Sequence, residues 1–111
     1  MDPRLRQGIM ETAQSLGMNP LDLATIISYE TGGTFDPTKR GPTTQWGQHR
    51  GLIQFGEPQA RQYGVNWNDP LGSQLGVNGG CRQVFHVERL EARHGNAGRL
   101  QHRERWRAGA I

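Results

Sequence analysis

Glu30 is the residue of this sequence best placed to do chemistry. It ends an apolar stretch that starts at Leu21, and Thr31, Gly32 and Gly33 follow it. Burial disfavours a carboxylate anion, and so do the unpaired carbonyls at a helix C-terminus. A carboxyl kept protonated near neutral pH acts as a general acid. We therefore expect catalysis from Glu30, although most helical glutamates are simply solvated.

A second apolar segment, GLIQFG from Gly51 to Gly56, follows about twenty residues after Glu30. Together, ETGGTFDP and GLIQ resemble the motifs E-S-x-F-x-P and G-L-M-Q of the lytic transglycosylases in the lysozyme-like superfamily. The resemblance spans about residues 20–80, is strongest between residues 26 and 56, and is closest to the compact phage branch. Glu30 matches the catalytic glutamate of that family, and Thr31 stands where the family usually has serine.

The resemblance implies a lysozyme-like helical domain that cleaves the β-1,4 bond between N-acetylmuramic acid and N-acetylglucosamine in peptidoglycan. It implies that Glu30 acts first as acid and then as base, while a hydroxyl of the substrate attacks. The substrate-binding residues that we expect are Thr31, Phe35, Trp46, Gly51, Leu52, Ile53 and Gln54. No metal or cofactor is required.

A two-carboxylate hydrolase is the weaker interpretation of the same site, because Asp36, Glu57 and Asp69 lie in predicted loops or at helix caps. Trp46 suits stacking on a sugar ring, although loop tryptophans more often fold back onto the core. We expect the side chain of His49 to be solvated rather than catalytic.

Capping signals predict the elements that must position these residues. Asn19-Pro20 starts a helix that ends near Glu30, and its face with Leu23 and Ile27 is expected to be buried. Similar pairs predict helices over residues 3–16, 57–63 and 69–75. Residues 36–50 have no periodicity and predict an irregular loop or a short hairpin. The fold class is therefore mainly α.

Length and composition indicate one small domain in a chain of 111 residues with 33% hydrophobic residues. Cys81 is the single cysteine, so an internal disulfide is excluded. The sequence has no apparent signal peptide and no membrane-spanning stretch. We expect a monomer made in the cytoplasm that acts on peptidoglycan glycan strands, either in phage lysis or as part of a virion.

The composition changes at Cys81. Residues 1–80 hold 6 basic and 7 acidic residues, for a net charge of −1, whereas residues 81–111 hold 7 arginines and 3 acidic residues, for a net charge of +4. We therefore predict a partial catalytic domain over residues 1–80 and a basic tail over residues 81–111.

Three interpretations of the tail compete. Arg99, Arg103 and Arg107 have helical spacing and could contact nucleic acid, lipid headgroups or anionic wall polymers. A second possibility, a metal site, has no support from ligand spacing; its candidate ligands are Cys81, His86, His94 and His102. The third is that the tail is translated from a shifted reading frame.

The shifted-frame hypothesis rests on reverse translation. With suitable synonymous codons, reading from the second base of the Gly80 codon gives AVAKYFMSNGLKPGMGM and, further on, GAYSIVNAG. The second of these re-translated stretches ends in asparagine-alanine-glycine. These three residues resemble a motif that the family carries after its second motif. The domain would then be incomplete at its C-terminus, with reduced stability and weak or no activity.

Two other functions remain open. One is a catalytically silent module that binds the cell wall or serves as a structural part of a virion. The weaker one is a nucleic-acid binder that uses the basic tail, so we regard a nucleic-acid partner as the less favoured option.

Overall fold

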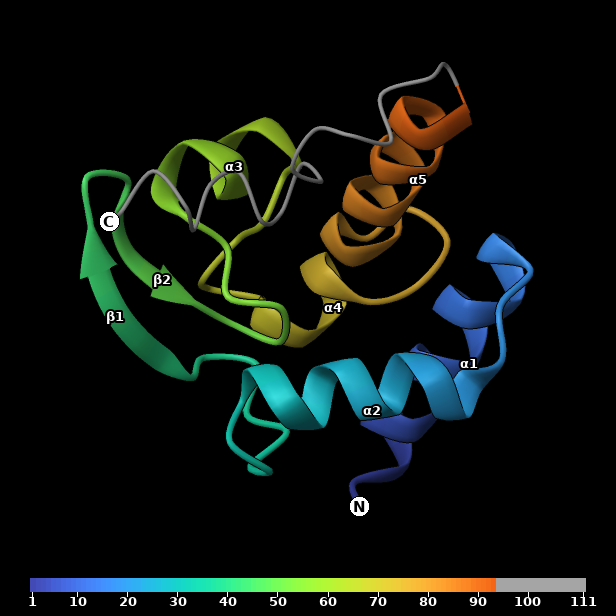
Figure 1. Ribbon diagram of the computed structural model, residues 1–111. Helices are drawn as coiled ribbons and strands as arrows, with labels where there is room; N and C mark the ends of the chain where they lie inside the picture. Colours follow the sequence, from blue (N-terminus) through green and yellow to red (C-terminus); the bar gives the residue numbers. More distant parts are fainter. Residues whose placement is uncertain (94–111) are drawn as a thin grey trace.

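The structure, a computed structural model, describes residues 1–93, of which residues 91–93 are described by their backbone alone. This part of the chain is mainly helical, with one small antiparallel sheet of two strands (Figure 1). The elements are α1 (Pro3–Leu16), α2 (Pro20–Glu30), β1 (Arg40–Thr44), β2 (Gly47–Arg50), α3 (Glu57–Gln62), α4 (Pro70–Gln74) and α5 (Gly80–Arg93). No helix within residues 1–93 is both long and apolar enough to cross a membrane.

The capping residues set the bounds of the first two helices, as predicted. The side chain of Asp2 accepts a hydrogen bond from the Arg4 amide, and that of Asn19 accepts one from the Leu21 amide. Gly17 ends α1 with a φ of 65°, and its amide donates to carbonyls of the last turn. Glycine adopts this left-handed conformation without the steric penalty that a Cβ would bring.

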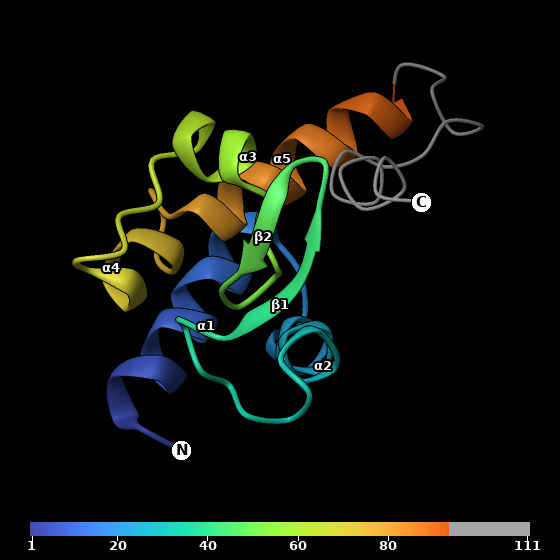
Figure 2. The same ribbon diagram turned by 90° about the vertical axis from the view of Figure 1, so that its left-hand side faces the viewer.

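The loop predicted for residues 36–50 contains a hairpin. Strands β1 and β2 pair antiparallel, with Arg40 opposite Arg50 and Thr44 opposite Gly47, and a register shift interrupts the ladder between Arg40 and Thr43. The hairpin lies at the left of Figure 1, beyond the end of α2, and faces the viewer in Figure 2. It follows the end of α2 in the chain and precedes the GLIQFG segment.

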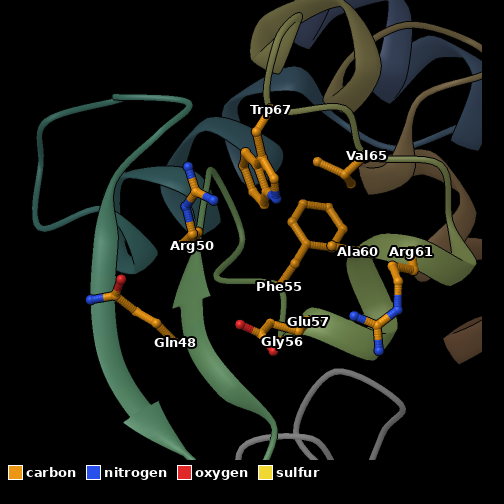
Figure 3. Close-up of a pocket in the computed structure, with 9 residues that line it drawn as sticks. All are labelled: Gln48, Arg50, Phe55, Gly56, Glu57, Ala60, Arg61, Val65 and Trp67. Atoms are coloured by element: carbon orange, nitrogen blue, oxygen red, sulfur yellow. The ribbon is translucent and has the colours of Figure 1, made fainter.

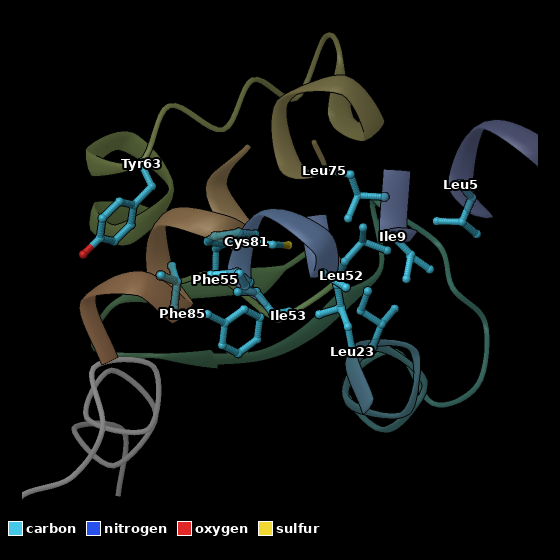
Figure 4. Close-up of a cluster of buried hydrophobic side chains, with 14 of the residues drawn as sticks. Leu5, Ile9, Leu23, Leu52, Ile53, Phe55, Tyr63, Leu75, Cys81 and Phe85 are labelled. Carbon is cyan, nitrogen blue, oxygen red and sulfur yellow. The ribbon is translucent and has the colours of Figure 1, made fainter. Parts of the chain in front are cut away.

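The hydrophobic core collects side chains from most of the helices and from GLIQFG (Figure 4). Leu5 and Ile9 come from α1, Leu23 and Ile27 from α2, and Phe55 from the segment before α3. In α2 the buried residues have the spacing that the amphipathic pattern predicts.

Helix α5 crosses the boundary predicted between residues 80 and 81. Cys81, Val84 and Phe85 are buried in the core, and α5 packs against both α1 and α4. A Cβ on Gly80 would lie 2.9 Å from the Cγ2 of Val65, which shows how closely the start of α5 approaches the neighbouring loop. The first part of the predicted tail is therefore an integral part of the fold, whereas residues 94–111 lie outside the described residues.

Candidate active site

Glu30 is the last residue of α2 and is buried, with 8% of its surface exposed. The helix ends there because the Gly33 amide donates to the Ser28 carbonyl at 2.7 Å, a bond that closes the final turn. Gly32 and Gly33 have φ values of 62° and 81°. The sequence thus places a carboxyl in a largely desolvated position at a helix C-terminus, as predicted from the glycine pair.

The side chain of Thr31 organises the turn that follows Glu30. Its hydroxyl donates to the Ile27 carbonyl at 2.8 Å and accepts from the Phe35 amide at 2.9 Å. Thr31 is fully buried. Its hydroxyl therefore fixes the loop beside Glu30, and a direct contact between this side chain and a substrate would require the loop to open.

Two predicted site residues have strained backbones. Phe35 and Gln54 have φ values of 53° and 58°, and no other non-glycine residue among those described has a positive φ. Non-glycine residues in this conformation cost roughly 1–3 kcal/mol and tend to gather at functional sites. Both lie in the segments that carry the family resemblance.

The side chain of Gln54 is almost fully buried. Its amide nitrogen donates to the carbonyls of Lys39 and Gly51, each at 3.0 Å, and its amide oxygen packs against Gly41. Gln54 therefore joins the GLIQFG segment to the start of the hairpin. This geometry gives the side chain a clear structural role, in addition to the substrate or Glu30 contact predicted for it.

Leu52 and Ile53 are fully buried core residues, and Gly51 is buried beside them. Gly51 has a φ of 93°, and a Cβ there would lie 2.6 Å from the amide oxygen of Gln74. The side chains of Leu52 and Ile53 pack in the core beneath the predicted site. If this segment forms the floor of a substrate cleft, only its backbone can contact the substrate, which is the role predicted for it.

Gln74 connects the two segments that carry the family resemblance, although nothing in the sequence singled it out. Its amide oxygen accepts from the Leu52 amide at 2.8 Å. Its amide nitrogen donates to the carbonyls of Pro37 at 2.7 Å and Pro70 at 2.8 Å. One fully buried side chain thus holds the loop after Glu30, the GLIQFG segment and α4 in register.

The expectation that His49 is solvated is wrong, because only 1% of its surface is exposed. Its Nδ1 lies 2.9 Å from the Gln54 carbonyl and its Nε2 lies 2.9 Å from the hydroxyl of Thr44. A carbonyl can only accept, so Nδ1 carries a proton. The alternation of β2 turns His49 inward, which a search for periodicity in a four-residue strand could not reveal.

Trp46 occupies the turn of the hairpin and is partly exposed. Its carbonyl accepts from the Glu57 amide at 2.9 Å, which joins the turn to the start of α3. Sugar stacking by this indole remains a prediction.

A cavity of about 360 Å³ lies between β2, α3 and the loop after α3 (Figure 3). Neither Glu30 nor any of the seven predicted substrate-binding residues is among the described residues that line it. Its wall contains Arg50, whose guanidinium carbon lies 4.1 Å from the centre of the Trp67 ring. No pattern in the sequence points to this pair, because α3 lies between the two residues in the chain.

The proposed metal ligands do not form a metal site within the described part of the chain. No group of three or more histidine, cysteine, aspartate or glutamate residues is close enough together there to hold an ion. Cys81 is buried and His86 is exposed. His94 and His102 lie outside the described residues, as do Arg99, Arg103 and Arg107 of the predicted basic helix.

Asp36 is a carboxylate whose pKa the fold clearly lowers. The Thr38 amide and the Thr38 hydroxyl both donate to it, and this bonding outweighs slight desolvation. Asp36 therefore stays ionised and caps the turn before the hairpin, which fits the structural role predicted for it.

Comparison of the chain with known protein families, with characterised proteins and with solved structures found no match.

Proposed function

We propose that this protein is a lytic transglycosylase with a lysozyme-like fold, cleaving the glycan strands of peptidoglycan with Glu30 as general acid and base. The observation that carries the proposal is the burial of Glu30 at the end of α2, in the segment whose motif resembles that family. The strained backbones of Phe35 and Gln54 support it, because both belong to the same two segments.

In this mechanism Glu30 gives its proton to the glycosidic oxygen, and the bond between that oxygen and the anomeric carbon breaks. A hydroxyl of the same muramic acid unit then attacks the anomeric carbon, and Glu30 takes up the hydroxyl proton. The product is an anhydro-muramyl end, and the enzyme returns to its starting protonation state. A single carboxyl is sufficient for this cycle.

A turbidity assay on a peptidoglycan suspension tests the role of Glu30. We expect the wild-type chain to clear the suspension and Glu30→Gln to lower the rate by at least about 100-fold, as for loss of a general acid. Glu11→Gln is the matched control, because Glu11 is an exposed helical glutamate on α1. Clearing by Glu30→Gln at the wild-type rate would refute the assignment.

Product mass separates transglycosylation from hydrolysis, because an anhydro end is one water lighter than a hydrolysed end. Glu57→Gln tests the competing two-carboxylate hydrolase, because Glu57 is one of its candidate second carboxylates; normal clearing by this variant would count against that role. A chain that sediments with peptidoglycan but releases no fragments would instead support the alternative of a silent wall-binding module.

A further inference from the structure

The wall of the cavity between β2 and α3 contains a guanidinium, that of Arg50, which is held against an aromatic ring. Arg50 stacks on Trp67, and Figure 3 shows the guanidinium beside the indole ring, with the ring of Phe55 nearby. Stacking of this kind restricts the guanidinium to one orientation. The cavity volume of about 360 Å³ is within the range of small-molecule sites.

The positive charge of Arg50 has no ionic partner among residues 1–93. Its Nε is buried there without a hydrogen-bond partner, and its side chain contacts Trp67 through the stack. A partly buried cation without a counter-ion is costly, and an anion that binds beside it offsets that cost. A guanidinium also matches the two oxygens of a carboxylate better than it matches a single acceptor.

We propose that this cavity binds a carboxylate carried by a small ligand with an apolar group. Phe55, Ala60 and Val65 supply the apolar wall, and Arg50 faces the same space. Glu57 and Arg61 line the cavity as well, so its wall carries two positive charges and one negative charge, a net charge of +1. A singly charged carboxylate neutralises this charge, whereas a doubly charged phosphate would exceed it. The proposal does not require Glu30 to cleave glycan.

Two sources of such a carboxylate are the C-terminus of a short peptide and an acidic sugar. The test is a titration of the ¹⁵N-labelled full chain, followed at the indole N–H of Trp67, whose signal is assigned with Trp67→Phe. The peptide probes are N-acetyl-alanyl-alanine and its C-terminal amide. The sugar probes are N-acetylmuramic acid, which has a carboxylate, and N-acetylglucosamine, which has none; inorganic phosphate is the fifth probe.

We expect at least one acid to bind about tenfold or more tightly than its uncharged counterpart, which identifies the source. Arg50→Met should abolish that preference, and Arg50→Lys should weaken it, because lysine keeps the charge but loses the planar fork. Arg40→Met is the matched control, since Arg40 is exposed and lies opposite Arg50 in the hairpin. It should bind as the wild type does.

The wild-type chain tests the proposal even if an Arg50 variant fails to fold, because the affinities of each acid and its uncharged counterpart are compared on the wild-type chain itself. Equal binding of acids and their uncharged counterparts, binding of none of the five probes, or stronger binding of phosphate than of either acid would overturn the proposal. So would an acid preference that persists in a folded Arg50→Met chain, since the stack with Trp67 would then be packing alone.

Discussion

Replacing Gln74 by leucine should destabilise the protein more than any exposed glutamine substitution does. Leucine has a similar volume, so the change removes hydrogen bonds without leaving a large cavity. The side chain of Gln74 makes three bonds, of 2.7 Å, 2.8 Å and 2.8 Å, to Pro37, Pro70 and Leu52. The bonds to Pro37 and Leu52 join segments that are far from Gln74 in the sequence.

The magnitude follows from the groups that the substitution leaves behind. The Leu52 amide and the Pro37 carbonyl would lose these bonds, and each buried polar group left without a partner costs about 1–3 kcal/mol. We therefore expect a loss of about 2–6 kcal/mol in the free energy of unfolding. Domains of this size are stable by only about 5–15 kcal/mol, so the variant would be marginal at 37 °C.

Urea unfolding followed by circular dichroism measures this effect. The midpoint should fall while the slope stays unchanged, since the surface exposed on unfolding is the same. Gln14→Leu is the control, because Gln14 is an exposed residue of α1 and its substitution should change the free energy by less than about 0.5 kcal/mol. A loss below about 1 kcal/mol for Gln74→Leu would show that these bonds do not hold the two segments together.

Three further predictions concern single residues. The fold lowers the pKa of Asp36 from its ordinary value of 3.8, so ionised Asp36 stabilises the folded state above pH 3.8, and this contribution is lost as the pH falls below 3.8. Asp36→Asn should therefore reduce the fall in unfolding free energy at acid pH. Gly8→Ala should lower the melting temperature despite its better helix propensity, because the added Cβ would lie 2.9 Å from Leu75; a higher melting temperature would show that Leu75 yields easily. Gly41→Ala should displace the Gln54 amide and lower stability by about 1–3 kcal/mol in urea unfolding, and an unchanged midpoint would count against that contact.

The sequence predicted the first two helices well because their ends are determined locally. Asn19 and Pro20 start α2 through one side-chain bond and one fixed φ, and the glycine pair ends it. Local rules of this kind need no knowledge of the tertiary structure. The same reasoning placed α3 and α4 to within one or two residues.

The sequence predicted the position of Glu30 but not the residues that hold its surroundings. Gln74 lies 37 residues from Pro37, and such a pairing depends on how the helices pack rather than on any local pattern. The stack of Arg50 on Trp67 has the same origin. Amide and guanidinium side chains have no periodic signature, so these contacts could not be predicted from spacing.

The change of composition at Cys81 was a poor guide to the fold. Composition averages over both faces of a helix, whereas packing depends on one face. Cys81, Val84 and Phe85 share a buried face, but the arginines of residues 81–111 led to the prediction of a basic tail. The charge asymmetry is real, but the helical spacing of Cys81, Val84 and Phe85 is the more informative signal for the fold.

The packing of α5 is compatible with the shifted-frame hypothesis as well as with the printed sequence. Re-reading from the second base of the Gly80 codon gives valine, tyrosine and phenylalanine at the positions of Cys81, Val84 and Phe85, so both frames put apolar or weakly polar side chains on the buried face. After Glu88 the two translations differ in their tendency to form a helix, because the shifted frame encodes glycine at the position of Arg89. Glycine there favours a helix that ends near that position, whereas α5 continues through Arg93. The base sequence of the gene decides between the two frames. Early stop codons in the shifted frame would refute the hypothesis. If that frame is open and encodes an asparagine-alanine-glycine motif, we expect a chain translated in the shifted frame from Gly80 onward to unfold at a higher urea concentration than this one.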